Sequence, residues 1–251
     1  MISNFNKQSS IDPKKFYNDT MPTKLGGDYE NARWHSSAFV EAQYAMMQDV
    51  LARHVLPRIQ RVKRVFEVGP GAGTWSRVLI KGLPNAQFTL LDISSEMLAR
   101  AQVALGKSDN LSYVEHDFVS YKSDEQFDVI FSSRAIEYMP DKVAVALATA
   151  TLLRRDGLGI FITKMPKPLL DRIAGRHLGG FHKGQIAPSA LARLFKDAGL
   201  KVVAIRMATA SVPLFHSPRL NRLAYRLFRS IPLVFPLTWL AESYIIIVRK
   251  T

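Results

Sequence analysis

The central part of the chain alternates short apolar runs with segments of helical periodicity. The apolar runs predict buried strands at residues 64–68, 88–92, 111–115, 127–132, 159–163, 200–207 and 244–248. Apolar residues at three- and four-residue spacing predict helices at 36–59, 74–83, 95–105, 140–155 and 188–198. Strands that alternate with helices of this length predict an α/β fold: a doubly wound, mostly parallel seven-stranded sheet with helices on both faces.

Residue types near the helix ends support these boundaries. Ser36 or Ser37 can cap the helix at 36–59, and Ser94 or Ser95 can cap the helix at 95–105. For the helix at 140–155 we expect Arg154 and Arg155 in the last turn and Gly157 just beyond, because basic residues and glycine are typical of helix C-termini. Residues 1–35 form a polar lead-in with several aromatics, which we expect to be loop-rich and to fold over part of the molecule.

A glycine-rich turn follows the first strand. Glu67 stands near the end of that strand, and Gly69, Gly71 and Gly73 follow at alternate positions before a helix begins. Glycine lets a ligand approach the main chain closely, and the helix start offers unpaired N–H groups. Carboxylates follow the next two strands, at Asp92 and Asp117, and the ends of parallel strands meet at one crevice. There Asp92 is placed to accept hydrogen bonds from the two hydroxyls of a ribose.

This set of residues resembles class I S-adenosylmethionine-dependent methyltransferases, which have a Rossmann-like fold. The family's first motif, an acid followed by Gly-x-Gly-x-Gly, corresponds to Glu67, Gly69, Gly71 and Gly73, and the likeness continues to about residue 163. The dinucleotide-binding pattern Gly-x-Gly-x-x-Gly fits less well, because Gly73 comes one residue early, and no P-loop pattern is present.

The resemblance implies a role for each matching residue and S-adenosylmethionine as the cofactor. Glu67 and the loop from Gly69 to Gly73 would hold the methionine part, and Asp92 the ribose. Ile93 and Met97 would pack on the adenine, although both could serve only helix packing. Asp117, beside Phe118, would reach the amino group of the adenine. The backbone carbonyl of Ser133 would point toward the cofactor's amino group. The implied domains are an N-terminal cap and helix at 1–60 and a catalytic domain at 61–251, with substrate-facing insertions at about 164–187 and 211–241.

Candidate catalytic residues lie after the fourth and fifth strands. Arg134, Glu137 and Tyr138 stand at the rim of the crevice, where they could contact the acceptor or move a proton. Alternatively, Arg134 and Glu137 pair with each other and orient the loop. His182, and less so His177, could act as the base that deprotonates a hydroxyl. No carboxylate cluster accompanies these histidines, so we expect no metal. The segment after the fourth strand, residues 132–140, departs from the Asn-Pro-Pro-Tyr type motif of the family's nitrogen-specific members.

Charge is concentrated in the C-terminal part of the chain. The net charge is +13, and residues 151–251 supply all of it, with 17 Lys and Arg against four acids. Within 211–241, Arg219, Arg222, Arg226 and Arg229 fall on one helical stripe, and leucines on another. Such a segment is typical of a helix on anionic lipid. The alternatives are a lid helix with its apolar face on the sheet or in a dimer interface and its arginines in water, and arginines that recognise an anionic acceptor.

The sequence therefore predicts an enzyme that transfers a methyl group to a small-molecule or lipid-linked acceptor, with oxygen favoured. Charge alone supports the runner-up, nucleic-acid methylation, because only one aromatic interrupts the arginine stripe. A membrane-associated scaffold that keeps the fold without catalysis is a further alternative, which the intact motif disfavours. The chain has no cysteine, signal peptide or apolar run of membrane-spanning length, so we expect a cytoplasmic protein, with peripheral attachment to the inner face of a membrane as the alternative.

Overall fold

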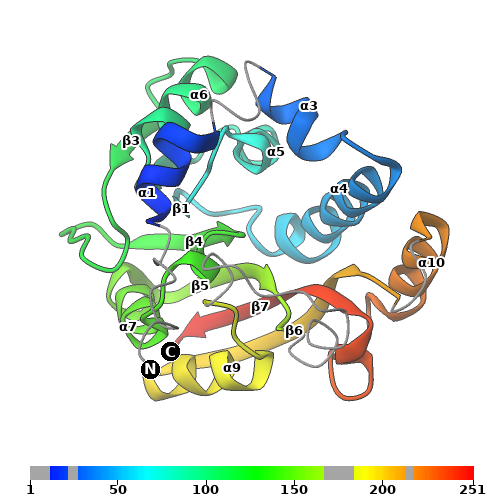
Figure 1. The fold of residues 1–251 in the computed structure, drawn as a ribbon. Helices are drawn as coiled ribbons and strands as arrows, with labels where there is room; N and C mark the ends of the chain where they lie inside the picture. The colour runs from blue at the N-terminus through cyan, green and yellow to red at the C-terminus, as the bar shows by residue number, and fades with distance from the viewer. Residues whose placement is uncertain (1–11, 22–27, 167–183, 213–216) are drawn as a thin grey trace, which may run out of the picture.

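The computed structural model describes residues 12–21, 28–166, 184–212 and 217–251, and its centre is one seven-stranded sheet (Figure 1). The strand order is β3-β2-β1-β4-β5-β7-β6. β3, β2, β1, β4 and β5 run parallel, and β7 is antiparallel to both of its neighbours. The strands are β1 Arg64–Val68, β2 Gln87–Asp92, β3 Leu111–Glu115, β4 Phe127–Ser133, β5 Leu153–Lys164, β6 Leu200–Ala210 and β7 Ala241–Lys250. The predicted fold class is confirmed.

Helices cover both faces of this sheet. In Figure 1, α3, α4 and α5 lie on one side and α9 lies on the other. The longer helices are α4 Ala38–Val50, α5 Thr74–Gly82, α6 Ser95–Leu105, α7 Lys142–Leu152, α9 Pro188–Asp197 and α10 Pro218–Phe228. The short elements are α1 Pro13–Lys15, η1 Phe16–Thr20, α3 Tyr29–Trp34, η2 Leu51–Val55, η3 Leu56–Arg58, η4 Ile136–Tyr138 and η6 Leu237–Trp239. No helix in the described part of the chain is long and apolar enough to cross a membrane.

The predicted caps of two helices are confirmed. The Ser37 hydroxyl accepts a hydrogen bond from the Val40 N–H at the start of α4, and the Ser94 hydroxyl accepts one from the Met97 N–H at the start of α6. These bonds satisfy backbone donors that have no partner within the helix. α4 packs on β6, where the Gln43 amide donates to the Ala210 carbonyl at 3.0 Å. The buried side chains of α4 belong to the same core as the sheet.

The predicted end of the helix at 140–155 is wrong. α7 stops at Leu152, and Arg154 and Arg155 belong to β5, not to a last helical turn. The Arg154 guanidinium pairs with Asp128 at the start of β4, which draws the chain into the sheet. Asp156 has a φ of 63°, and the ladder with β4 shifts register here. Gly157 therefore belongs to a β-bulge. A larger residue would not fit there, because its Cβ would lie 2.9 Å from the Arg154 carbonyl oxygen.

Candidate active site

The glycine loop between β1 and α5 forms one side of a cavity of about 420 Å³. Gly69 has a φ of 70°, and a Cβ there would lie 2.3 Å from the Cβ of Ala135, so the loop after β4 can approach only a glycine. Gly71 has a φ of 57°, and nothing lies within 4 Å of where its Cβ would be. Both line the cavity, whereas Gly73 caps α5 and does not. The loop thus exposes backbone to a ligand at Gly71.

Asp92 ends β2 with its carboxylate at the cavity. Its Oδ2 accepts from the Gly71 N–H at 3.2 Å, and its Oδ1 accepts from the Ser94 N–H at 3.0 Å. Burial raises the pKa of this carboxyl to about 6, even though these backbone donors favour the charged form. Two fixed acceptor oxygens at the mouth of a glycine loop suit a pair of hydroxyls on a ligand.

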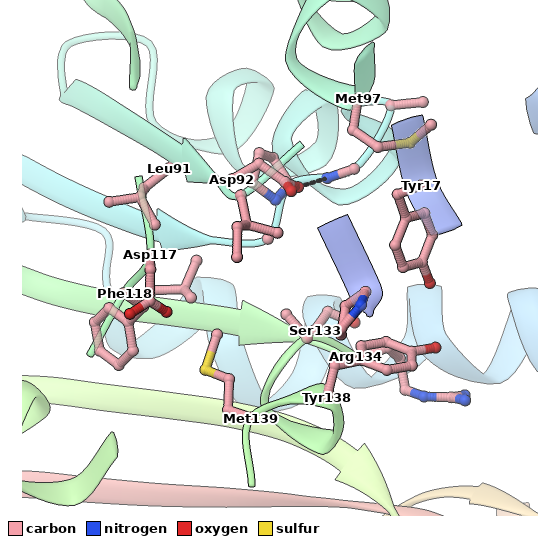
Figure 2. A pocket seen from close by; sticks show the side chains of 18 of the residues that line it. Tyr17, Leu91, Asp92, Met97, Asp117, Phe118, Ser133, Arg134, Tyr138 and Met139 are labelled. Atoms are coloured by element: carbon pink, nitrogen blue, oxygen red, sulfur yellow. Dashed lines mark hydrogen bonds between the residues drawn. The ribbon is translucent and has the colours of Figure 1, made fainter. Parts of the chain in front are cut away.

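The remaining predicted cofactor residues surround Asp92 on three sides. Figure 2 shows Met97 near Asp92, Asp117 with Phe118 on a second wall, and Ser133 on a third. Ile93 also lines the cavity. Asp117 Oδ2 accepts from the Ser120 hydroxyl at 2.9 Å, which fixes that carboxylate beside the ring of Phe118. Asp92, Asp117 and Ser133 lie at or just after the ends of β2, β3 and β4, which are parallel strands of one sheet, so the predicted crevice at these strand ends is present.

Glu67 lies outside the wall of the cavity. Its side chain is 1% exposed, and burial raises the pKa of its carboxyl to about 8. Its Oε2 and the Ser133 hydroxyl are buried without a hydrogen-bond partner among the described residues. Buried polar atoms without partners are rare in folded proteins and call for one. Of the two, only Ser133 lines the cavity, where the polar groups of a cofactor could supply the missing partner.

Arg134 and Glu137 form a buried ion pair in the loop after β4. Arg134 has a φ of 65°, and its Nε donates to both carboxylate oxygens of Glu137, at 3.1 and 3.0 Å. The Lys164 N–H also donates to Glu137 Oε2, at 3.1 Å. Burial opposes ionisation of Glu137, but the Arg134 guanidinium lowers the pKa of this carboxyl overall. A low pKa makes Glu137 a poor base.

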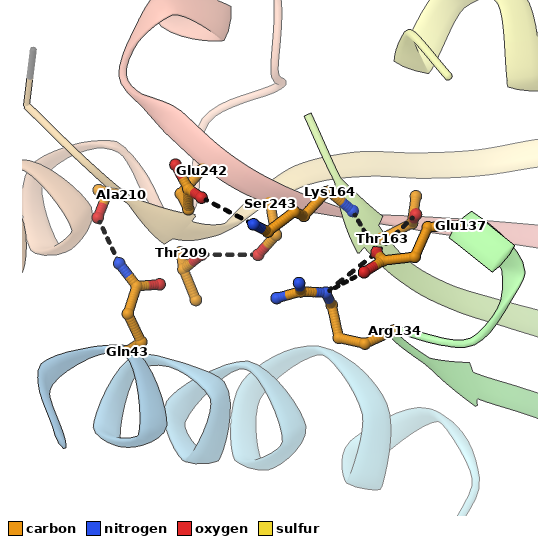
Figure 3. A network of polar contacts seen from close by, with 9 residues as sticks. All are labelled: Gln43, Arg134, Glu137, Thr163, Lys164, Thr209, Ala210, Glu242 and Ser243. Carbon is orange, nitrogen blue, oxygen red and sulfur yellow. Dashed lines mark hydrogen bonds and ion pairs between the residues drawn. The ribbon is translucent and has the colours of Figure 1, made fainter. Parts of the chain in front are cut away.

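The pairing alternative for Arg134 and Glu137 is therefore the arrangement found. Figure 3 shows the network: Glu137 meets Arg134, Thr163 and Lys164, and Lys164 approaches Glu242 of β7. Glu137 is fully buried and lies outside the cavity wall, whereas Arg134 lines it. Glu137 thus orients Arg134 toward the cavity and does not itself face a substrate.

Tyr138 faces the lead-in across the cavity. The rings of Tyr17 and Tyr138 meet edge to face with their centroids 5.8 Å apart, and Figure 2 shows Tyr138 beside Arg134. Burial raises the pKa of Tyr17, and the neighbouring Tyr138 adds to this effect. His182 and His177 lie outside the described residues, so their prediction as bases stays a prediction. In the described part of the chain, no group of acids and histidines could hold a metal ion.

The cavity also contains residues that the sequence did not single out. Tyr17, Tyr29, Arg33 and Trp34 of the lead-in line it, so the expected folding over the molecule is confirmed for the described residues of this segment. The expected loop-rich character is wrong for them, because α1, η1 and α3 are helical. The Trp34 indole N–H donates to the Thr74 hydroxyl at 3.3 Å, which ties the lead-in to the first turn of α5. Its aromatic residues were the only local signal, and they did not reveal where the lead-in docks.

A family model described as a methyltransferase domain matches residues 66–158. The match contains the glycine loop, Asp92, Asp117 and the Arg134–Glu137 pair. Over 136 residues the chain is 29% identical to malonyl-[acyl-carrier protein] O-methyltransferase 1 of Ilyobacter polytropus, an alignment that covers 53% of this chain and 51% of that protein. Over 157 residues it is 32% identical to ubiquinone biosynthesis O-methyltransferase of Neisseria meningitidis serogroup C, covering 57% and 65%. The chain thus spans only about half to two thirds of the length of these curated relatives.

Solved structures share the fold. Magnesium protoporphyrin IX methyltransferase from Synechocystis PCC 6803, solved with bound S-adenosylhomocysteine (SAH), superposes with a TM-score of 0.63. The superposition covers 95% of this chain and 97% of that one, at 16% sequence identity. A sequence identity this low shows a shared fold only. The evidence for the cofactor site is the glycine loop together with Glu67, Asp92 and Asp117. The chain thus contains a methyltransferase domain at residues 66–158, and as a whole it has the fold of class I S-adenosylmethionine-dependent methyltransferases.

Proposed function

We propose that this protein transfers a methyl group from S-adenosylmethionine to an oxygen atom of a small-molecule or lipid-linked acceptor. The observation that carries the proposal is the cavity, where the open backbone at Gly71 and the carboxylates of Asp92 and Asp117 face the aromatic residues of the lead-in. One side suits the cofactor, and the other encloses the space that an acceptor needs.

The cofactor's place follows from the polar groups along the cavity. We assign Asp92 to the ribose hydroxyls, Asp117 to the adenine amino group, and Ile93, Met97 and Phe118 to the faces of the adenine. Ser133 lines the cavity with a buried hydroxyl that lacks a partner and suits the polar end of the methionine part, and Glu67, which lies behind the wall, would support the loop that holds it. When bound, the cofactor supplies a methyl group on a positively charged sulfur.

The acceptor side consists of Tyr17, Tyr138, Trp34 and Arg134. Transfer from a sulfonium needs alignment and exclusion of water more than acid–base chemistry. The aromatic rings exclude water, and Arg134, held by Glu137, presents its guanidinium to an oxygen of the acceptor. Tyr138 and His182 are the residues we propose for proton transfer, and Glu137 is a positioning residue.

Oxygen as the methylated atom is supported by the names of the two curated relatives, which are a malonyl-[acyl-carrier protein] O-methyltransferase and a ubiquinone biosynthesis O-methyltransferase. For this chain we propose the same chemistry without choosing between these acceptors. The division into an N-terminal cap at 1–60 and a catalytic domain at 61–251 remains part of the proposal.

The test is titration calorimetry with S-adenosylmethionine and SAH on wild type, Asp92→Ala and the control Asp124→Ala, whose side chain is exposed. Loss of the hydrogen bonds that the ribose hydroxyls donate to a carboxylate should weaken SAH binding by roughly ten- to a hundredfold in Asp92→Ala, and Asp124→Ala should bind like wild type. Methyl transfer is then followed as SAH release with malonyl thioesters, prenylated phenols and RNA. A folded wild type that binds neither cofactor would overturn the proposal in favour of the scaffold; transfer to RNA alone would favour nucleic-acid methylation.

A further inference from the structure

α10 buries two polar side chains and exposes its leucines. Asn221 and Tyr225 are its buried side chains. Leu220, Leu223 and Leu227 are 40%, 54% and 61% exposed. The alternative of a lid helix whose leucines rest on the sheet is therefore wrong. Its contact with the core is made by Tyr225, Ala224 and Phe228, so the three leucines are not needed for that contact.

Specific hydrogen bonds hold α10 in this orientation. The Tyr225 hydroxyl and the Arg229 guanidinium both donate to Asp49 Oδ2 of α4, each at 3.0 Å. Asn221 Oδ1 accepts from the Val212 N–H at 2.8 Å. Arg229 thus leaves the predicted stripe of free arginines, because it is bound to α4. Arg219, Arg222 and Arg226 remain exposed on α10.

The exposed leucines continue into the segment that follows the helix. This segment stays close to the sheet, because the Leu233 N–H donates to the Ile205 carbonyl of β6 at 3.1 Å. Figure 1 shows α10 at the end of the sheet where β6 leads into it. We call the following exposed side chains the apolar surface: Leu220, Leu223, Leu227, Ile231, Val234, Phe235 and Trp239. Seven large apolar side chains exposed within twenty residues mark an interaction site.

The positive charge around the apolar surface indicates which kind of partner it can bind. Residues 198–241 contain no Asp or Glu, and three exposed arginines flank the leucines. A second copy of the chain would bring these like charges together across a two-fold interface. Nucleic acid would leave the leucines and Val234 in water. An anionic lipid surface accepts both kinds of group, because arginines reach its headgroups while leucine, phenylalanine and tryptophan enter the acyl boundary.

We propose that the apolar surface docks this protein on an anionic lipid bilayer, with α10 in the plane of the interface. The proposal goes beyond methyl transfer and does not need it. Arg219, Arg222 and Arg226 contact headgroups, and the Asp49 contacts keep the leucines outward in the absence of lipid.

Vesicle flotation tests the docking. Wild type is mixed with vesicles of phosphatidylcholine alone or with phosphatidylglycerol. It should float with the anionic vesicles only, and less so as salt is raised. The variant Arg219→Gln/Arg222→Gln/Arg226→Gln should lose roughly a hundredfold in affinity. Leu223→Glu/Leu227→Glu should not float. Controls are Arg193→Gln and Val103→Glu, whose side chains are exposed elsewhere on the molecule, and both should behave like wild type.

SAH binding by calorimetry on the same samples separates the two proposals. Every variant should bind SAH like wild type, because none touches the cavity; this shows that the variants are folded. Wild type that stays unbound with anionic vesicles at low salt overturns the docking proposal, whatever SAH does. Binding that survives Leu223→Glu/Leu227→Glu also overturns it, and displacement of that binding by RNA would assign the surface to nucleic acid.

Discussion

Glu67 and Asp92 are buried carboxyls whose pKa values lie above their usual range, at about 8 and about 6. Both are raised first by burial. A group buried in its neutral form makes the folded state sensitive to pH, and the affected range lies between its ordinary and its folded pKa. The two residues therefore connect the cofactor site with the stability of the whole chain.

We predict that Glu67→Gln flattens the pH dependence of folding. The folded pKa of Glu67 is above its ordinary 4.5, so its stabilising contribution is complete below that value and is lost as pH rises through about 8. Wild type should lose stability relative to Glu67→Gln across this window, by a few kcal/mol at pH 8. Urea unfolding at several pH values measures the difference. Glu125→Gln, exposed on a loop, is the control; parallel wild-type and Glu67→Gln curves would contradict the prediction.

At the scale of the element, the glycines of the loop differ in whether they are needed for folding or for ligand binding. Gly69, Gly71 and Gly199 all have positive φ, but a Cβ would meet Ala135 at Gly69 and open space at the other two. Gly71 opens on the cavity, and Gly199 lies far from it, between α9 and β6. The three positions therefore form a matched set.

We predict different outcomes for alanine at these three positions. Gly199→Ala should cost about 1–2 kcal/mol of stability from backbone strain alone and leave SAH binding unchanged. Gly71→Ala should cost about the same, yet weaken SAH binding roughly tenfold or more, because its methyl group enters the cavity. Gly69→Ala should be the least stable, because it also displaces Ala135. Thermal unfolding and calorimetry measure both quantities, and unchanged SAH affinity in Gly71→Ala would contradict the cofactor's placement.

The sequence predicted elements whose signals are local. The apolar runs of β1, β2 and β4 and the motif from Glu67 to Asp117 lie within short stretches, so their positions could be predicted. The end of α7 could not, because the Arg154–Asp128 pair joins residues 26 positions apart. The outward leucines of α10 depend on Asp49, more than 170 positions away. The lead-in's contribution to the cavity likewise depends on distant partners, as with Trp34 and Thr74.

At the scale of the whole molecule, the lead-in and the glycine loop form one unit. The Thr74 hydroxyl accepts from Trp34 and donates to Glu30, while Trp34 packs edge to face on Trp75. The lead-in, which covers the cavity like a cap, is thus hydrogen-bonded to α5, the helix that begins at the glycine loop. Opening of the cap should be coupled to the first turn of α5.

We predict that Thr74→Val loosens this cap. Amide hydrogen exchange should become faster in residues 28–36 and stay unchanged in β4 and β5, and SAH should dissociate faster because the lead-in covers it less well. Thr151→Val is the control, since its hydroxyl bonds only within α7. Exchange in 28–36 that matches wild type would show that ring packing alone holds the cap.

The position of β7 has a consequence for how the chain is made. β7 lies between β5 and β6, although it follows both in the sequence. A ribosome therefore releases β5 and β6 with their facing edges unpaired, and the gap closes only when residues 241–250 emerge. Until then the nascent chain exposes two strand edges with apolar side chains, which is when such chains aggregate or recruit chaperones. Slow translation just before Ala241 would lengthen that interval, so synonymous codons there would affect yield without changing one residue.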